Sequence, residues 1–413
     1  MKINYNLKKI NIQTLSNLNI ILLFIGVQFV TSFFLVGVED PTLSRSVTLP
    51  FRFLVLVLSM YIIFFTKKSA IIDRIFFFWV LFLIVFTIII CWDIFTGKVI
   101  PIDKNQILMF IFLINFPLVF SLQGSLMHID FDKVLKYVYY LSIFTTLFII
   151  FTNPSVFSIS NMIEERVSGS VAFSTISFGH FCSTISLLAI NNFIYRDKNK
   201  LQLLTSFLIF LFGMFCMIKS GSRGPIFSMI SIGTFVYLIK SKNIVSFFKK
   251  IILVSISIFS LINLFLIVLK NISPYLEQRL RVSIENGDLG GRQSYYDIAF
   301  EYISNNLFFG KQFLLKFNEY DYFYAHNIFL DILIASGIFG LLFFLVIMIK
   351  VFKNINYIFK NEKSYIWLCL IFLQYFTFLL LSGAFYMDPI FIGTTTLLIL
   401  LNEKYFTNIK SVS

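Results

Sequence analysis

Five basic side chains in the second half of the chain have the chemistry to bind an anion or to move a proton: Arg223, Arg279, Arg281, Arg292 and His326. A guanidinium can hold two phosphate oxygens through parallel hydrogen bonds, and a neutral imidazole can accept a proton near neutral pH. All five fall on the outer side of the topology that the rest of the chain predicts, where positive charge opposes the usual bias. This placement favours ligand binding, although a long solvated loop also carries some arginines by chance.

The first of three notable stretches is 220–225, which reads Ser-Gly-Ser-Arg-Gly-Pro. Gly and Ser allow close approach of the backbone, and Pro225 suits the first turn of a helix. We therefore expect a helix that begins at the outer face, with Arg223 beside its positive N-terminal end. Such a pair would make an anion site. A plain capped helix start is the alternative interpretation.

The second stretch begins with Gly-Gly-Arg at 290–292. Behind it, Tyr295, Ile298, Ala299 and Tyr302 recur at the spacing of one helix face. The pattern predicts an amphipathic helix on the outer membrane surface, with Arg292 at its N-terminal end. A structural lid without a chemical role would have the same pattern.

The third stretch, 320–327, reads Tyr-Asp-Tyr-Phe-Tyr-Ala-His-Asn and leads into an apolar run. Tyr322 and Tyr324 could stack on sugar rings beside His326, although aromatic residues before a span usually form an interfacial belt. Asn327 and Asp331 are four residues apart and share a helix face. A charge inside a span is costly and is usually paired, so we expect Asp331 to pair with His326 or with an outer arginine.

The elements that must position these residues are membrane helices. Hydrophobic residues make up 58% of the 413 positions and charged residues 13%, with 55 Phe. A soluble domain is about 45–50% apolar and about 25% charged, so lipid is the solvent here. The net charge of +13 is spread over short clusters between apolar runs. Because no single basic face results, we expect no nucleic-acid partner.

A membrane span needs about 20 mostly apolar residues. On this basis we predict an all-α polytopic membrane protein, a single integral membrane domain over residues 1–413 with about twelve transmembrane helices. The predicted spans are 19–38, 51–66, 75–95, 106–121, 134–152, 171–194, 201–218, 224–239, 247–269, 326–349, 365–384 and 388–402. One large external loop, 271–325, carries the amphipathic helix.

The distribution of Lys and Arg predicts the orientation. With a cytoplasmic N-terminus, the inner segments hold 21 of these residues and the short outer segments hold 7. Positively charged loops stay in the cytoplasm. We therefore expect both termini to be cytoplasmic and the loop at 271–325 to be external.

In combination, the three stretches resemble the O-antigen ligase and polymerase family of bacterial inner-membrane enzymes. The family pattern has Ser-Arg-Gly opening a span, then Arg at a loop helix with an aromatic residue four positions on and an Asn-x-x-x-Gly end, then His-Asn opening a span with Gly-x-x-Gly. The matching residues are Ser222, Arg223, Gly224; Arg292, Tyr296, Asn306, Gly310; and His326, Asn327, Gly337, Gly340. The resemblance covers about residues 170–345. Ala335 and Leu307 depart from the family's usual Glu and Pro.

The resemblance implies glycosyl transfer at the outer face of the inner membrane. The donor would be an oligosaccharide on undecaprenyl diphosphate, and the acceptor a sugar hydroxyl. Arg223, Arg292 and His326 would be catalytic. Substrate would be bound by Ser222, Arg281, Tyr296, Tyr322, Tyr324 and Asn327. Glu164, Glu165 and Arg166 form a second-choice acid/base group.

The residue types agree with a metal-independent inverting transfer, because arginines can neutralise a departing diphosphate. His128, His180 and the four cysteines (Cys91, Cys182, Cys216 and Cys369) lie scattered along the chain, so we expect no metal and no other cofactor. Other expected partners are membrane lipid and, as an option, a chain-length regulator protein.

Three functions stay open at this point. A polymerase of O-antigen or capsular polysaccharide joins lipid-linked repeat units, and a ligase moves the finished glycan to the lipid A–core of lipopolysaccharide. The motifs do not separate the two, and we favour the polymerase. A lipid-linked sugar flippase or another transporter is the alternative from a different class. Transporters usually carry internal repeats and charges at mid-membrane, whereas the notable charges here lie at the outer edge.

Overall fold

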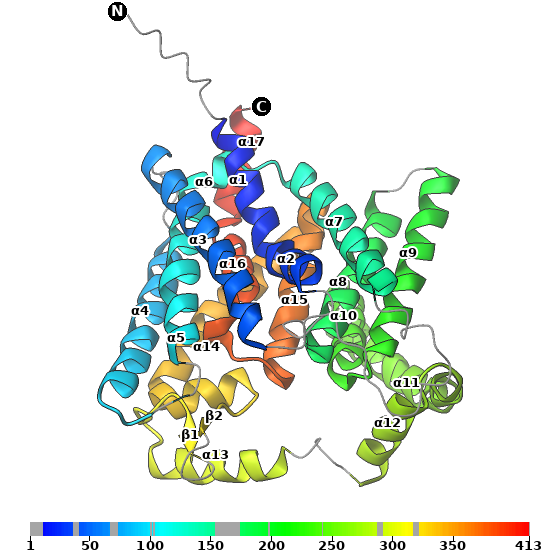
Figure 1. Cartoon of the computed structure of the whole chain (residues 1–413). Coiled ribbons are helices and arrows are strands. Elements are labelled where there is room, and N and C mark those ends of the chain that lie inside the picture. Colours follow the sequence, from blue (N-terminus) through cyan, green and yellow to red (C-terminus); the bar gives the residue numbers. More distant parts are fainter. Residues whose placement is uncertain are drawn as a thin grey trace, which may run out of the picture.

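The computed structural model describes residues 11–35, 41–66, 73–99, 101, 104–152, 174–196, 199–241, 243–286, 292–316 and 322–412. Helices account for nearly all of them (Figure 1). The strands β1 (Leu315–Lys316) and β2 (Tyr322–Phe323) form one short antiparallel pair in these residues, with Leu315 opposite Phe323. Helices dominate because lipid offers no hydrogen bonds to the backbone, so each spanning segment must satisfy its own.

Eight helical segments of the described residues are long and apolar enough to cross a membrane. They are Ile12–Phe34, Val47–Phe65, Arg74–Phe95, Lys104–His128, Phe131–Thr152, Lys200–Lys219, Ile328–Asn361 and Lys363–Leu381. Helices also coincide with the other four predicted spans: α8 (Thr175–Tyr195), α10 (Arg223–Ile239), α11 (Ile244–Ile272) and α16 (Pro389–Leu400). The all-α membrane class is confirmed, and the number of twelve crossings stays a prediction.

The remaining elements follow the chain in order. They are α1 (Ile12–Ile21), η1 (Leu22–Gly26), α2 (Val27–Phe34), α3 (Pro41–Phe65), α4 (Arg74–Phe95), α5 (Lys104–Met109), η2 (Phe110–Asn115), α6 (Phe116–Ser125), η3 (Leu126–His128), α7 (Phe131–Thr152), α9 (Lys200–Lys219), α12 (Pro274–Asn286), α13 (Gln293–Asn305), α14 (Ile328–Asn361), η5 (Lys363–Tyr365), α15 (Ile366–Leu381), η6 (Phe385–Met387) and α17 (Glu403–Val412).

Side-chain caps explain where many of these helices begin. Short polar residues before each apolar run accept a hydrogen bond from the free N–H groups of the first turn. The capping residues are Asn11, Asp73, Ser174, Asn199, Asn243, Asn327 and Asp388.

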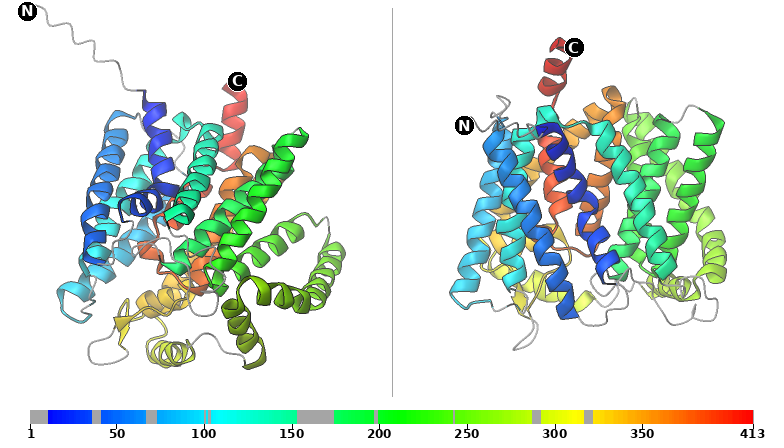
Figure 2. Two further views of the ribbon diagram at one scale, coloured as in Figure 1. Left: turned by 45° about the vertical axis from the view of Figure 1, so that its right-hand side comes forward. Right: turned by 45° about the horizontal axis from the view of Figure 1, so that its top comes forward.

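Different elements lie at the two ends of the helix bundle. The start of α1 and the C-terminal helix α17 lie at one end, and α12, α13 and the β1–β2 pair lie at the other (Figure 1). The two further views in Figure 2 keep this arrangement. α11 is seen almost along its axis in Figure 1, so it crosses the upright helices α8 and α9 at a steep angle. The segment predicted as a large external loop is thus largely α12, α13 and the strand pair.

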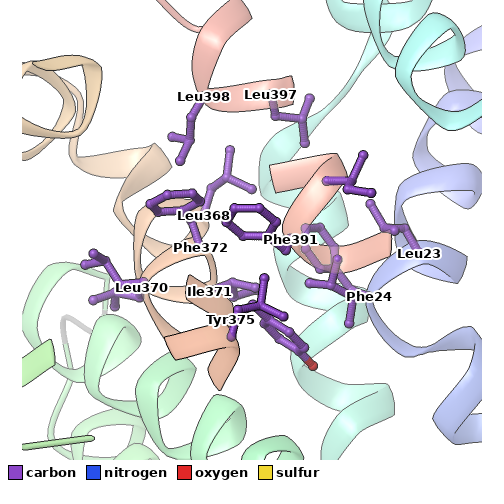
Figure 3. Packing of buried hydrophobic residues seen from close by; sticks show 14 of the residues in the cluster. Leu23, Phe24, Leu368, Leu370, Ile371, Phe372, Tyr375, Phe391, Leu397 and Leu398 are labelled. Carbon is purple, nitrogen blue, oxygen red and sulfur yellow. The ribbon is translucent and has the colours of Figure 1, made fainter. Parts of the chain in front are cut away.

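The two short helices α15 and α16 form the centre of the hydrophobic core. Their apolar side chains pack together and against Leu23 and Phe24 of η1 (Figure 3). The rings of Phe372 and Phe391 stack with centroids 5.8 Å apart. Between the two helices, residues 382–388 interrupt the apolar run within the protein interior. Irregular backbone at this depth is tolerated only where protein or a cavity surrounds it.

The loop that follows α13 is hydrogen-bonded to a break in α14. Gly337 has φ of 65° and interrupts the helix, and the freed amide of Ile338 donates to the carbonyl of Leu307 at 2.8 Å. Gly310 also has positive φ, and a Cβ there would lie 2.5 Å from the carbonyl oxygen of Ile334. Only glycine permits both the backbone conformation and this close approach. The two glycines therefore fasten the end of α13 to α14.

Candidate active site

Two of the predicted site residues, Arg292 and Asn327, form hydrogen bonds with the C-terminal end of α15. The Arg292 guanidinium donates to the carbonyl of Leu381, and its second nitrogen, Nη2, lies 3.2 Å from the hydroxyl of Ser382. The side-chain amide of Asn327 donates to the carbonyl of Leu380 at 3.2 Å. The last carbonyls of a helix have no partner inside the helix and carry partial negative charge. The Arg292 guanidinium and the Asn327 amide supply hydrogen bonds to these carbonyls.

His326 binds the same helix end. Its Nδ1 lies 3.1 Å from the carbonyl oxygen of Ser382, and the hydroxyl of Tyr324 lies 3.3 Å from the same oxygen. The Tyr324 ring packs on the imidazole with centroids 4.3 Å apart. Because a carbonyl can only accept, Nδ1 must carry the proton, which leaves Nε2 of the neutral ring as a proton acceptor.

The backbone and the surroundings of His326 are both unusual. Its φ is +56°, in the left-handed region that non-glycine residues rarely adopt. Burial lowers the pKa of His326 below its ordinary value, and the charge of Arg292 lowers it further, against the opposing effect of the Ser382 carbonyl. His326 is therefore a neutral base at pH 7.

A cavity of about 800 Å³ opens beside this helix end. Arg292, His326, Tyr322 and Tyr324, four of the predicted site residues, line it. The rest of the lining includes Gln28, Ser174, Ser177, His180, Tyr295, Tyr375, Ser382, Tyr386 and Asp388. Small-molecule sites usually have about 300–1,000 Å³ and a few convergent polar groups, and this cavity meets both criteria.

Tyr295, and not the predicted Tyr296, reaches the cavity. The Tyr295 ring lies 4.6 Å from that of Phe323 and 6.1 Å from the imidazole of His326. Neighbouring residues of a helix point about 100° apart, so both side chains cannot share one face. The amphipathic pattern had placed Tyr295 on one face with Ile298, Ala299 and Tyr302, and α13 is a helix over these residues.

Arg223 makes different contacts from the other two predicted catalytic residues. α10 begins at Arg223, as predicted, with Ser222 as a buried N-cap residue whose side chain makes no cap bond. The guanidinium of Arg223 donates to the hydroxyl of Ser283 and to the carbonyl of Arg279 at 3.2 Å, and Arg279 donates to the carbonyl of Gly221 at 3.0 Å. These contacts attach α12 to the start of α10, and neither Ser222 nor Arg223 belongs to the described cavity lining.

Arg281 and Asp331 also have partners that the sequence did not indicate. Arg281 is exposed on α12 and pairs with Glu277 at 2.7 Å and Glu285 at 3.6 Å. The buried carboxylate of Asp331 accepts from the backbone amide of Ala325 at 2.7 Å. Among the described residues, neither His326 nor an arginine pairs with Asp331, so the expected pairing is not found there. Asn327 caps α14 through Oδ1, which accepts from the amide of Phe329 at 3.0 Å.

The sequence reading missed the segment between α15 and α16, which supplies Ser382 and Asp388 to the cavity. Asp388 caps α16, because its Oδ1 accepts from the amide of Phe391 at 2.9 Å. The available signal was Ser-Gly at 382–383 and Asp-Pro at 388–389 inside apolar sequence. Irregular backbone at membrane depth is tolerated only where it is buried in protein or lines a cavity, so these turn residues indicate a cavity.

Residues 207–345 match the model of the O-antigen ligase family. The chain carries an O-antigen ligase domain. Arg223, Arg292 and His326 all lie within it, as do α10 to α13 and the break in α14. The end of α15 and the segment up to Asp388 lie beyond it, so part of the cavity lining comes from outside the matched O-antigen ligase domain. No curated protein matches the chain.

Several predicted residues lie outside the described part of the chain. They are Glu164, Glu165, Arg166, Gly290, Gly291, Tyr320 and Asp321. Among the described residues, no group of three or more His, Cys, Asp or Glu side chains is arranged to hold a metal ion.

Proposed function

We propose that the protein is a glycosyltransferase that joins undecaprenyl-diphosphate-linked repeat units into O-antigen or capsular polysaccharide. The observation that carries the proposal is the convergence of Arg292 and His326 on the end of α15, where both line one cavity. Tyrosine rings beside them offer flat apolar faces for sugars. The family match supports transfer of a glycan and does not distinguish a polymerase from a ligase.

In the proposed reaction, Nε2 of His326 takes the proton of an acceptor hydroxyl. The hydroxyl oxygen attacks the anomeric carbon of the lipid-linked sugar from the side opposite the diphosphate, and the bond from that carbon to the phosphate oxygen breaks. Configuration is inverted, and undecaprenyl diphosphate leaves with the bonding electrons. Arg292 offsets the charge that develops on the leaving oxygen, and neither step requires a metal.

Reconstitution with two acceptors should separate the candidate functions. The purified protein in liposomes, given lipid-linked repeat unit alone, should build a ladder of longer lipid-linked glycans. Rough lipopolysaccharide added as a second acceptor should gain no glycan. Gel electrophoresis of the lipid and lipopolysaccharide fractions measures both products.

A ligase is the second candidate, because the matching family carries that description. Transfer to rough lipopolysaccharide without a ladder would favour the ligase over our proposal. Movement of lipid-linked substrate across the liposome membrane without a new glycosidic bond would instead indicate a flippase.

We propose that the site faces the outer side of the bacterial inner membrane, with both termini in the cytoplasm. Ser294 on α13 and Ser364 in η5 are both exposed. The ring of Tyr365 in η5 lies 5.1 Å from that of Phe406 in α17, and α17 and α13 lie at opposite ends of the bundle (Figure 1). In a background without the four native cysteines, Ser294→Cys should react with a membrane-impermeant maleimide in intact spheroplasts. The matched variant Ser364→Cys should react only after permeabilisation. The reverse pattern would contradict the proposed orientation.

A further inference from the structure

A groove of about 450 Å³ lies along α14, apart from the candidate active site. Most of its lining comes from α14, where Leu345, Ile349 and Phe352 contribute apolar side chains, and Phe376 of α15 belongs to the other wall. The groove shares no lining residue with the cavity of the candidate active site. Ile349 is 55% exposed, so the groove is open to the surroundings of the bundle, which for a membrane helix are lipid.

The lining residues of α14 follow one face of the helix. Leu345, Ile349, Phe352 and Asn356 recur at spacings of four, three and four residues, which form a single stripe on an α-helix. From Leu345 to Asn356 this stripe rises by about 16 Å, at about 1.5 Å per residue. The hydrocarbon core of a bilayer is about 30 Å thick, so the groove has roughly the length of one leaflet.

The polar members of the lining, Lys353 and Asn356, belong to the same end of the groove. No described residue forms an ion pair or a hydrogen bond with the side chain of either one. Lys350, one turn earlier, pairs instead with Asp73 at 3.5 Å. The described lining contains no Asp or Glu. An exposed, unpaired ammonium and an amide donor therefore lie at the end of an apolar groove.

This polar end of the groove lies toward α17. The ring of Tyr357, next to Asn356 in the chain, stacks on that of Phe406 in α17 with centroids 5.8 Å apart. α17 is at the end of the bundle opposite α13, which is the cytoplasmic end in the proposed orientation (Figure 1). A groove of one leaflet's length that ends there reaches the headgroups of the cytoplasmic leaflet. Basic pockets between membrane helices on this side bind anionic headgroups.

We propose that the groove binds a phospholipid of the cytoplasmic leaflet whose headgroup has a net negative charge. Its phosphate contacts Lys353 and Asn356, because an ammonium supplies the opposite charge and an amide supplies a hydrogen bond. One acyl chain lies along the apolar stripe, where its burial removes hydrocarbon surface of Ile349 and Phe352 from less complementary surroundings. The site is separate from the proposed reaction, and only the choice of leaflet depends on the proposed orientation.

The lipid carrier of the proposed reaction would also offer phosphate and a hydrocarbon chain. Its diphosphate must reach Arg292, which precedes α13 and binds the end of α15. Lys353 lies toward the opposite end of the bundle. The position of the unpaired charge therefore favours a phospholipid of the other leaflet.

Native mass spectrometry of the full-length protein in mild detergent measures which lipids stay bound. The probes are phosphatidylglycerol, whose headgroup is anionic, and phosphatidylethanolamine with the same acyl chains and no net charge. The wild-type protein should bind one phosphatidylglycerol with a Kd about fivefold lower than that of phosphatidylethanolamine. Lys353→Gln should abolish this difference, whereas Lys353→Arg should keep it because the charge is kept.

Lys360→Gln is the matched control for charge. Lys360 is exposed on the same helix and lies outside the groove, so this variant should bind phosphatidylglycerol as the wild type does. Equal affinity of the wild type for both lipids would indicate ordinary boundary lipid and overturn the inference. An equal loss in Lys353→Gln and Lys360→Gln would assign the effect to overall charge and overturn it as well.

A phosphatidylglycerol with a diazirine in one acyl chain locates the chain. In phosphatidylcholine liposomes, the cross-linked peptides should include residues 345–352, and excess unlabelled phosphatidylglycerol should suppress this cross-link. A cross-link confined to other helices would contradict the placement. Stronger suppression by undecaprenyl diphosphate would assign the groove to the lipid carrier and reject the phospholipid. None of these measurements requires turnover, so a failure of the proposed function leaves them unaffected.

Discussion

Replacing His326 by Ala or Asn should lower the turnover number by about 10²–10⁴-fold, the usual contribution of a general base. The expected loss follows from the tautomer, because the Ser382 carbonyl holds the proton on Nδ1 and leaves Nε2 free to accept another. The rate of ladder formation by reconstituted protein measures the effect. Expression and membrane insertion should stay unchanged.

Asn is the matched replacement, because it tolerates left-handed backbone better than other non-glycine residues and His326 has φ of +56°. Its side-chain amide can still donate to the Ser382 carbonyl. His326→Asn therefore removes the base while keeping the local structure. A correctly inserted Asn variant that still built a full ladder would exclude His326 as the base.

The pH dependence tests the same role. Burial and Arg292 lower the pKa of His326 below its ordinary value of 6.5, so the base is unprotonated at neutral pH. As the pH falls through this lowered pKa, the ring takes up a proton and the rate should fall. The wild-type rate should accordingly stay level around pH 7 and decline only in the acidic range, and His326→Asn should lack this decline.

Replacing Arg292 by Lys should lower kcat/KM by about 10²–10³-fold, although the charge is kept. Two nitrogens of the guanidinium reach two different groups, the Leu381 carbonyl and the Ser382 hydroxyl. The ammonium of Lys is not planar and cannot form both hydrogen bonds in this geometry. The Lys variant would therefore lose these bonds, and its charge would no longer be fixed at the edge of the cavity. Initial rates over a range of lipid-linked repeat unit give kcat/KM.

Arg196→Lys is a matched control for this substitution. Arg196 pairs with Asp132 of α7, and neither residue belongs to the described cavity lining, so Arg196→Lys should give wild-type kinetics. If Arg292→Lys matched Arg196→Lys in rate, the guanidinium fork would have no part in the reaction.

Local sequence signals predicted the elements that carry the site. Apolar runs gave the helices, Pro225 marked the start of α10 beside Arg223, and the spacing of Tyr295 and Ile298 gave α13. Each of these features depends on residues within a few positions of one another, so residue types and spacing were sufficient.

Contacts between distant segments were not predictable in this way. Arg292 binds a carbonyl 89 positions further along the chain, and every residue type has that carbonyl. The spacing of the amphipathic helix pointed to Tyr295, but the family pattern led us to predict Tyr296 as the substrate-binding residue. Arg223 was grouped with Arg292 because both are arginines at helix starts, whereas tertiary packing gave Arg223 the partners Arg279 and Ser283 on α12.

The anchors of Arg292, His326 and Asn327 on α15 have a consequence for sequence changes in this helix. Most of these anchors are main-chain oxygens, so exchanging the side chains of Leu380 and Leu381 for other helix formers deletes none of them. Inserting or deleting one residue within Ile366–Leu381 is different, because it rotates the helix end by about 100° and shifts it by about 1.5 Å. Side-chain changes at Leu380 and Leu381 therefore keep the anchors, whereas a change in the length of α15 displaces them.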